Sequence, residues 1–361
     1  MNLSMEAAVN NDKQKDRRRP GREGLSPLAC TVFALVTVFT FVLCICLGSV
    51  NIPAGKIFST FASAVSGSAS ADQTEYAILL TVRLPRVLCV ALTGASLALS
   101  GAAMQGLLRN PLADGSTLGV SSGASLGAVI AMAFGAIVPG LPASGTMIMA
   151  MLSAFLSMMI IIVLAYKIDY SLSTNTIILI GIIYSMFMNS IISLILTMVP
   201  DKIKNITFWT MGSLAGSSMK NAAVLAAALL VCGTVILRYA DELNAFSIDE
   251  TNAANIGVSV KKVRLVILIM VSVLIGICVS TGGTIAFVGL VTPHIVRIIT
   301  GPNHRKLLPA VLFTGAVFLM LADLLARMIF RPRELPIGVI TSFVGAVVFV
   351  FIFYRSRSRR A

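Results

Sequence analysis

Charged residues are scarce in this chain. Only 12% of its 361 residues are Asp, Glu, Lys or Arg, whereas 57% are hydrophobic and the mean hydropathy is +0.92. An ordinary soluble domain has roughly a quarter of its residues charged, so this composition excludes that class and indicates a polytopic membrane protein. The 28 Lys and Arg residues outnumber the 15 acids, but they lie mainly between and beyond the apolar runs. That placement is typical of the inner face of a membrane and does not suggest nucleic-acid binding.

Several motifs of catalysis and metal binding are also missing. No GxxxxGK[ST] phosphate loop occurs, so the chain is not expected to bind and hydrolyse ATP itself. The six cysteines form no CxxC pair, and His294 and His304 form no HExxH motif. A GxSxG pattern around Ser125 matches a hydrolase elbow, but it lies in a series of small residues within an apolar segment. We therefore expect no catalytic residue, metal site or cofactor.

Apolar runs of about 20 residues, long enough for membrane helices, recur along the chain. They cover about 28–50, 86–108, 117–137, 145–166, 175–199, 220–239, 263–281, 285–300, 307–328 and 336–354. The first run is longer than the apolar core of a signal peptide, about 7 to 15 residues. The sequence predicts an all-α membrane protein of about ten spans with both termini cytoplasmic. A basic tail (1–27) would precede a single membrane-embedded domain (28–361), with a cytoplasmic loop at about 240–262.

The stretch 83–124 links two of these runs. Small residues recur every four positions in each run, a spacing that lets helix backbones approach closely in lipid. The first series is Gly94, Ala98, Ala102 and Gly106, and the second is Gly119, Gly123, Gly127, Ala131 and Gly135. Asn110-Pro111 ends the first run, because the residue before a proline is pushed out of helical geometry. We expect two tightly packed helices joined by a turn.

Six short motifs lie along the chain: RLPR (83–86), RNPLA (109–113), LGVSSGA (118–124), GLVTPHIVR (289–297), ADLLAR (322–327) and ELPIG (334–338). Together and in this order they resemble the motifs of a known family, the FecCD family of permease subunits in bacterial ABC importers for ferric siderophores, haem and cobalamin. The resemblance implies a bacterial plasma-membrane protein that translocates a chelate by alternating access at a dimer interface. Its partners would be two copies of an ATP-binding subunit, an extracytoplasmic substrate-binding protein, and a second permease copy or paralogue. A ferric siderophore is the first expectation, with cobalamin or haem as alternatives.

Five arginines run against the usual charge bias because they lie on the predicted outer face: Arg83, Arg86, Arg327, Arg331 and Arg333. Lipid headgroups and a local Asp323–Arg327 pair at i, i+4 spacing would explain them structurally. In the family that the chain resembles, arginines of these motifs dock acidic residues of the substrate-binding protein. The resemblance therefore implies a docking role for Arg83, Arg86 and Arg327.

The loop at 240–262 contains a further helix signal. Ser247 and Glu250 have the spacing of a capping box and Gly257 is placed to end a helix, which predicts one helix of about nine residues, from Ile248 to Asn255 or Ile256. An ordinary ordered loop is the alternative. The resemblance implies that this helix couples the permease to the ATPase through Glu250, Ala253, Ala254 and Gly257.

Two polar turns lie at the predicted inner face. By residue type they are ordinary helix caps, since Ser, Thr and Asn favour helix starts. The resemblance raises Asn110, Leu112, Ser173 and Thr174 to candidates for a cytoplasmic gate. It also includes His294 and Arg297, to which we assign a structural or signalling role.

An ion-coupled secondary transporter is the main rival interpretation. Such proteins place ionisable groups near the middle of the membrane. Asp323 is the only acid that the sequence puts clearly inside a span, and it lies toward the outer end beside Arg327. This position argues against ion coupling.

Overall fold

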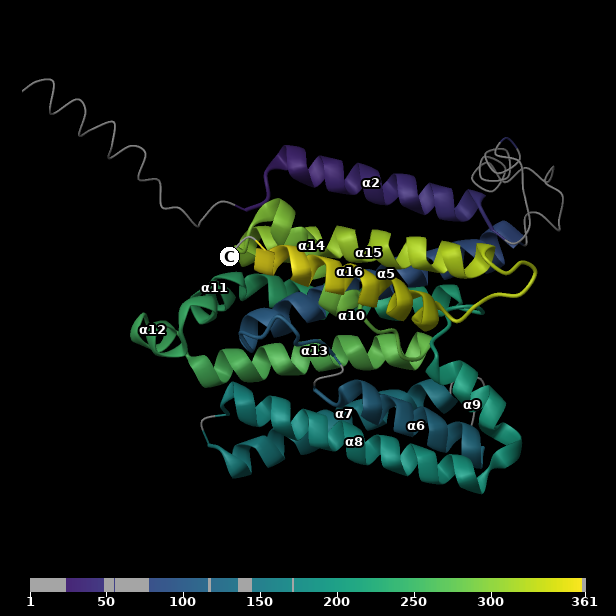
Figure 1. Cartoon of the computed structure of the whole chain (residues 1–361), viewed down its shortest axis with the longest axis horizontal. Helices are drawn as coiled ribbons and strands as arrows, with labels where there is room; N and C mark the ends of the chain where they lie inside the picture. The colour runs from purple at the N-terminus through teal and green to yellow at the C-terminus, as the bar shows by residue number, and fades with distance from the viewer. Residues whose placement is uncertain are drawn as a thin grey trace, which may run out of the picture.

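The computed structural model describes residues 24–48, 55, 78–115, 118–135, 145–170 and 172–358. Most of the predicted basic tail, residues 1–23, lies outside the described residues. Within these ranges every regular element is a helix, and the long helices lie side by side in one bundle (Figure 1). The predicted all-α membrane fold is confirmed.

Seven helices are long and apolar enough to cross a membrane in the described part of the chain. They are α2 (Pro27–Cys46), α5 (Leu84–Leu107) with the preceding η1 (Ile78–Arg83), α7 (Gly145–Ile168), α8 (Thr174–Met198), α10 (Met219–Arg238), α13 (Val260–Gly282) and α15 (His304–Met328). Three apolar helices are shorter or have a shorter apolar part: α6 (Val120–Phe134), α14 (Val288–Thr300) and α16 (Ile337–Ser358). Each of the ten predicted runs therefore coincides with a helix. The remaining elements are η3 (Pro200–Lys202), α9 (Ile203–Thr210), α11 (Ala240–Ile248) and α12 (Glu250–Asn255).

Local sequence explains where several of these helices begin. The Ser26 hydroxyl accepts a hydrogen bond from the Ala29 amide, and the Asn303 side chain accepts one from the Arg305 amide, so each acts as an N-cap. The short helices α6 and α14 start differently, after residues in the left-handed region, Gly119 at φ 74° and Phe287 at φ 68°. Sequence periodicity did not reveal these turns, and for this reason both helices were predicted too long.

Small residues bring α5 into direct backbone contact with its neighbours. A Cβ added at Gly94 would lie 2.3 Å from the Gly315 carbonyl oxygen of α15, and one at Gly101 would lie 1.9 Å from the Gly289 carbonyl oxygen of α14. The second small-residue series packs α6 on α7, where a Cβ at Gly123 would lie 1.7 Å from the Ser157 hydroxyl oxygen. The expected close packing is therefore present in both series, and α5 lies at the centre of the bundle.

The bundle has two distinct ends, which we call the α12 end and the α9 end after the helices found there (Figure 1). Helix α15 connects them. Its first residue, His304, donates its backbone amide to Asn244 of α11, and near its other end Arg327 contacts carbonyl oxygens at the C-terminus of α2. At 1.5 Å per residue, these two positions are about 35 Å apart. Arg327 and the α12 region thus lie at opposite ends, as the predicted topology requires.

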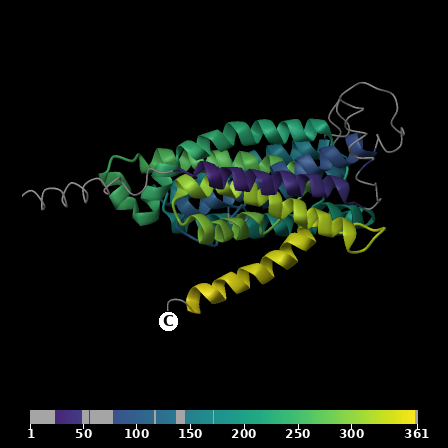
Figure 2. The same cartoon turned by 90° about the horizontal axis from the view of Figure 1, so that it is seen from above.

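Helix α16 diverges from the other helices toward its C-terminus (Figure 2). It packs mainly on α14 and α15, and Gly345 lies against the Phe287 side chain. Phe343, Val347 and Val350 of α16 are exposed. Helix α8 likewise has exposed apolar residues, including Leu179, Phe187 and Leu194. Both helices therefore present apolar surface to lipid or to another membrane protein.

Candidate docking, coupling and gating sites

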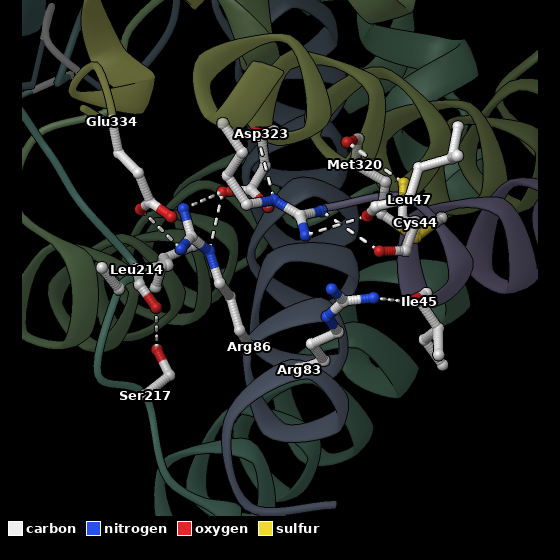
Figure 3. A network of polar contacts seen from close by, with 12 residues as sticks. Cys44, Ile45, Leu47, Arg83, Arg86, Leu214, Ser217, Met320, Asp323 and Glu334 are labelled. Atoms are coloured by element: carbon white, nitrogen blue, oxygen red, sulfur yellow. Dashed lines mark hydrogen bonds and ion pairs between the residues drawn. The ribbon is translucent and has the colours of Figure 1, made fainter. Parts of the chain in front are cut away.

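Arg86 is the centre of a buried ion-pair network at the α9 end. Its guanidinium lies 2.9 Å from the Asp323 carboxylate and 2.7 Å from that of Glu334 (Figure 3). Asp323 also pairs with Arg327 at 2.9 Å, which is the predicted local pair. Asp323 is 1% exposed. One carboxylate is thus shared between two guanidiniums, an arrangement that satisfies charges that would otherwise be costly to bury.

The remaining arginine contacts are with the end of α2. Arg83 donates to the Ile45 carbonyl at 2.8 Å, and Arg327 donates to the Cys44 carbonyl at 3.3 Å. The last carbonyls of a helix lack partners within the helix and carry the negative end of its dipole. The two arginines therefore cap α2 and attach it to α5 and α15. We call Arg83, Arg86, Asp323, Arg327 and Glu334 the arginine network.

All three predicted docking arginines are buried in this conformation. Arg83 is 6% exposed, Arg86 8% and Arg327 3%. The acids that pair with Arg86 and Arg327 belong to the chain itself. The sequence predicted such an internal acid only for Arg327. Exposed charges do flank the network, at Arg331 and Arg333 in the α15–α16 loop. The docking role of the three arginines stays a prediction.

At the α12 end, the loop in which one helix was predicted contains two, α11 and α12. Ser247 is not the predicted N-cap, because it lies inside α11 and its hydroxyl donates to the Leu243 carbonyl. The chain breaks at Asp249, with φ −168° and ψ 149°, and α12 then covers only Glu250–Asn255. Gly257 follows in the left-handed region at φ 90°, which agrees with its expected role as a helix terminator. The capping-box spacing was misleading here because Ser247 lies within α11, a helix that the sequence did not predict.

The predicted coupling residues differ in accessibility. Ala254 and Gly257 are exposed, Glu250 is half-buried, and Ala253 is fully buried against the rest of the chain. Sequence reasoning missed two exposed apolar side chains beside α12, Ile248 at 75% and Ile256 at 73% exposure. Large apolar residues clustered outside the membrane spans are typical of protein contacts. Their position in a polar loop was the signal that could have found them.

The predicted gate residues form two turns that approach α12. Asn110 accepts a hydrogen bond from the Leu112 amide at 2.9 Å, which closes one turn, and Leu112 is exposed. Ser173 precedes α8 in the other turn, and the Thr174 hydroxyl donates to the Glu250 carboxylate at 3.4 Å. The structure thus brings a predicted gate residue into contact with a predicted coupling residue. The gate assignment itself stays a prediction.

His294 and Arg297 support the first turn from α14. The His294 ring nitrogen Nε2 lies 3.0 Å from the Pro111 carbonyl oxygen, and Arg297 donates to the Gln105 side chain at 2.5 Å. The side chains of α14 therefore contact the 110–112 turn and the end of α5. The structural or signalling role of His294 and Arg297 stays a prediction.

A cavity of about 330 Å³ lies between α5, α6, α8 and α13. Hydroxyl groups line it, among them those of Ser100, Ser121 and Ser125, and so does the carboxylate-bearing Asp114. Asp114 follows the Asn110-Pro111 helix stop in the sequence, and it shares this cavity with Asn189 of α8. Within the described ranges, no group of three or more His, Cys, Asp or Glu residues could hold a metal ion.

Comparison with known proteins identifies the family. Residues 36–355 match the FecCD transport family. The chain is 41% identical to an uncharacterized ABC transporter permease protein, YvrB of Bacillus subtilis, over 88% of this chain and 90% of that protein. It is 36% identical to the cobalamin import system permease protein BtuC of Halobacterium salinarum, over 93% and 88% of the two chains. A solved structure of an inward-facing ABC transporter assigned to the metal-chelate type covers 91% of this chain and 100% of that chain, with a TM-score of 0.81 and 30% identity.

The family match covers nearly all of the helical bundle, from within α2 to the last turns of α16. The matches extend over most of each relative's own length, and both relatives are named as permeases. An enzyme is therefore excluded as the family's activity, and the resemblance found in the sequence motifs is confirmed. This chain is an integral membrane protein that belongs to the FecCD family of ABC transporter permeases.

Proposed function

We propose that this chain is the permease subunit of an ATP-driven importer in a bacterial plasma membrane. Two copies, or this chain and a paralogue, form a translocation pathway at their interface, which opens alternately to either side. One observation carries the proposal: two surfaces suited to different partners lie at opposite ends of the bundle, about 35 Å apart along α15. The exposed apolar faces of α8 and α16 support a contact with a second permease subunit.

An ATPase subunit binds at the α12 end in this proposal. Ala254 and Gly257 would contact it together with Ile248 and Ile256, which are the exposed apolar groups there. Glu250 and Ala253 face the permease instead and would transmit the movement inward. With two permease subunits, two ATPase copies would be engaged. Glu250 contacts Thr174, so closure of the ATPase would reach the proposed gate at Asn110, Leu112, Ser173 and Thr174.

The substrate-binding protein docks at the α9 end in this proposal. The arginine network contains three guanidiniums and two carboxylates, so its side chains carry an excess of one positive charge. Glu334 is the partly exposed member of the network, with 32% of its side chain accessible. An acidic group of the docked protein would displace Glu334 from Arg86. Arg83 and Arg327 would then be reached through the end of α2.

A ferric siderophore is the proposed cargo. Relatives of the chain include iron chelatin permeases of Helicobacter pylori, at 37% identity over 78% of this chain. Cobalamin and haem are the alternatives, since relatives named for both occur at 36% and 35% identity. A molybdate permease of Haemophilus influenzae, at 32% identity, extends the range to oxyanions.

Reconstitution tests this function directly. We expect proteoliposomes that contain the permease, its ATPase and its substrate-binding protein to accumulate the ferric siderophore when ATP is enclosed with the ATPase. Accumulation should continue without an ion gradient and should stop when the binding protein is omitted. Uphill transport by the permease alone would contradict the proposal. Parallel assays with cobalamin and haem decide among the three cargoes.

A further inference from the structure

Arg264, near the start of α13, is a fully buried charge at the α12 end. Its side chain is 0% exposed, although Lys261 and Lys262 beside it are exposed. A buried guanidinium is costly unless its hydrogen-bonding groups find partners. The contacts of the Arg264 guanidinium therefore explain why an arginine can occupy this buried position.

The two terminal nitrogens of Arg264 hold two different parts of the chain. Nη2 donates to the Glu250 carboxylate of α12 at 2.6 Å, and Nη1 donates to the Leu172 carbonyl in the α7–α8 turn at 2.5 Å. A planar guanidinium presents donors in fixed directions, which a lysine ammonium on a flexible stem does not. Arg264 thus fixes the distance and the angle between α12 and the residues that lead into α8.

Glu250 extends this contact to both predicted gate turns. Its Oε1 atom also accepts from the Thr174 hydroxyl and lies 3.7 Å from the Arg109 guanidinium, directly before the Asn110 turn. Leu172 and Arg109 both occupy the left-handed region, at φ 55° and 47°. Such conformations persist in non-glycine residues where surrounding contacts hold them. The two turns and α12 therefore meet at the Glu250 carboxylate, which also pairs with the buried Arg264.

We propose that Arg264 is a positioning residue that makes α12 and the start of α8 move as one unit. A displacement of α12 by the ATPase then shifts the turns at 109–112 and 172–174 together. The inference rests on the proposed function, since it assumes that an ATPase acts on α12. Arg264 itself is fully buried and would contact no partner protein. It would determine how much of the movement of the ATPase reaches the gate.

The test uses the reconstituted importer with the full chain. Arg264→Lys keeps the charge but cannot reach both acceptors with the same geometry. The double variant R264Q/E250Q removes both charges, so that neither is left buried alone. Lys262→Gln is the matched control, because it removes one positive charge from the same turn of α13 at an exposed position. Each variant is measured for thermal unfolding, for the amount of ATPase that co-purifies, and for uptake per ATP hydrolysed.

We expect Arg264→Lys and the double variant to retain the ATPase and to hydrolyse ATP, with uptake per ATP lowered roughly tenfold. Lys262→Gln should match the wild type. Spectroscopic labels at Asn255 and Ile168, both exposed, should show an ATP-dependent change in separation only in the Arg264 variants, because α12 then moves without the α7–α8 turn.

Two results would overturn the inference. Unchanged uptake per ATP in stably folded Arg264 variants would show that the link is not needed, while the proposed function would stand. If the wild-type permease bound no ATPase or moved no cargo on ATP hydrolysis, the proposed function would fail, and this inference with it. A fall in unfolding temperature with unchanged coupling in the surviving protein would reduce Arg264 to a structural residue.

Discussion

At the scale of single residues, this membrane protein concentrates buried charge at two places, one at each end of the bundle. The arginine network contains Asp323, 1% exposed, and the α12 end contains Arg264, 0% exposed. Each is shared between elements that are far apart in sequence. Asp323 joins α5 to α15, and Arg264 joins α12 to the turn before α8. Such groups constrain how helices sit against each other, because separating them would leave a buried charge unpaired.

Asp323 should be the most sensitive residue of the arginine network. Asp323→Asn leaves the guanidiniums of Arg86 and Arg327 without their shared carboxylate, and breaking a buried pair costs about 3 to 5 kcal/mol. We expect a lower thermal unfolding temperature for the purified variant in detergent. Asp201→Asn, an exposed acid in η3, serves as the control and should leave unfolding unchanged. Equal unfolding temperatures for the two variants would contradict the role of Asp323.

The sequence could predict only the local part of this chemistry. The i, i+4 spacing indicated the Asp323–Arg327 pair, but Arg86 is 237 residues away from Asp323, and no pattern within one segment reports such a pairing. Family resemblance drew attention to the arginines and implied that they pair with acidic residues of a partner protein. Burial and internal acids are properties of the folded bundle, and so they became visible only in the structure. Arg264 gave no signal at all, since it lies in a basic run with Lys261 and Lys262.

At the scale of elements, the small-residue series determine which helices touch. Helix α5 contacts α15 through Gly94 and Gly315, and α14 through Gly101 and Gly289, with no room for a side chain between the backbones. Spacing predicted the close approach at Gly94, because a four-residue repeat puts small residues on one helix face. Gly101 lies outside that repeat, and its contact with α14 was not predicted. It could not predict that α6 and α14 are short. The residues just before them, Leu118 and Gly119 for α6 and Ile285 to Phe287 for α14, are apolar or small, so the predicted runs included them.

Gly101 should tolerate no added carbon atom. A methyl group there would lie 1.9 Å from the Gly289 carbonyl oxygen, whereas one at Gly233 of α10 would lie 3.4 Å from its nearest neighbours, an ordinary contact. Both substitutions to alanine gain about 1 kcal/mol of helix propensity. We expect Gly101→Ala to lower stability by about 1 to 3 kcal/mol through overpacking and Gly233→Ala to be neutral or stabilising. Thermal unfolding of the two variants measures the difference, and equal stability would contradict the packing at Gly101.

Gly257 tests the proposed role of α12. A β-branched residue at φ 90° is strained, but a Cβ at this position would meet no neighbouring atom, so the bundle should still assemble. We expect Gly257→Ile to hydrolyse ATP with little uptake, because the side chain would protrude where the ATPase is proposed to bind. The ratio of transported cargo to hydrolysed ATP is the measurement.

Gly301 provides a matched control for that experiment. It ends α14 at φ 80°, also with open space at its Cβ, and it lies near the start of α15 at the same end of the bundle. Gly301→Ile therefore also introduces backbone strain at a positive φ, but outside the α11–α12 loop, and its transport ratio should stay at the wild-type value. Equal losses in the two variants would attribute the effect to strain and would argue against a partner at α12.

At the scale of the whole molecule, the question is where the energy for transport enters. The family assignment and the separation of the two ends favour ATP, delivered through α12. Asp114 favours the rival, since it lines a cavity between α5, α8 and α13 together with the polar residues Ser100 and Asn189. An ionisable residue inside a membrane protein is a functional candidate by default. This residue lies just after the Asn110-Pro111 helix stop, where the sequence predicts a turn between two helices.

The two energy sources predict different responses to ionophores. If ATP alone drives uptake, collapsing the proton and sodium gradients across the proteoliposome should leave the initial rate unchanged in the wild type and equally in Asp114→Asn, whatever the absolute rate of the variant. If an ion is carried on the Asp114 carboxylate, the ionophores should slow the wild type, and the neutral amide should remove that sensitivity because it cannot exchange a proton or balance a cation. The comparison of the two sensitivities isolates the source of energy, since a variant that is merely impaired in folding loses rate without changing its response to the gradient.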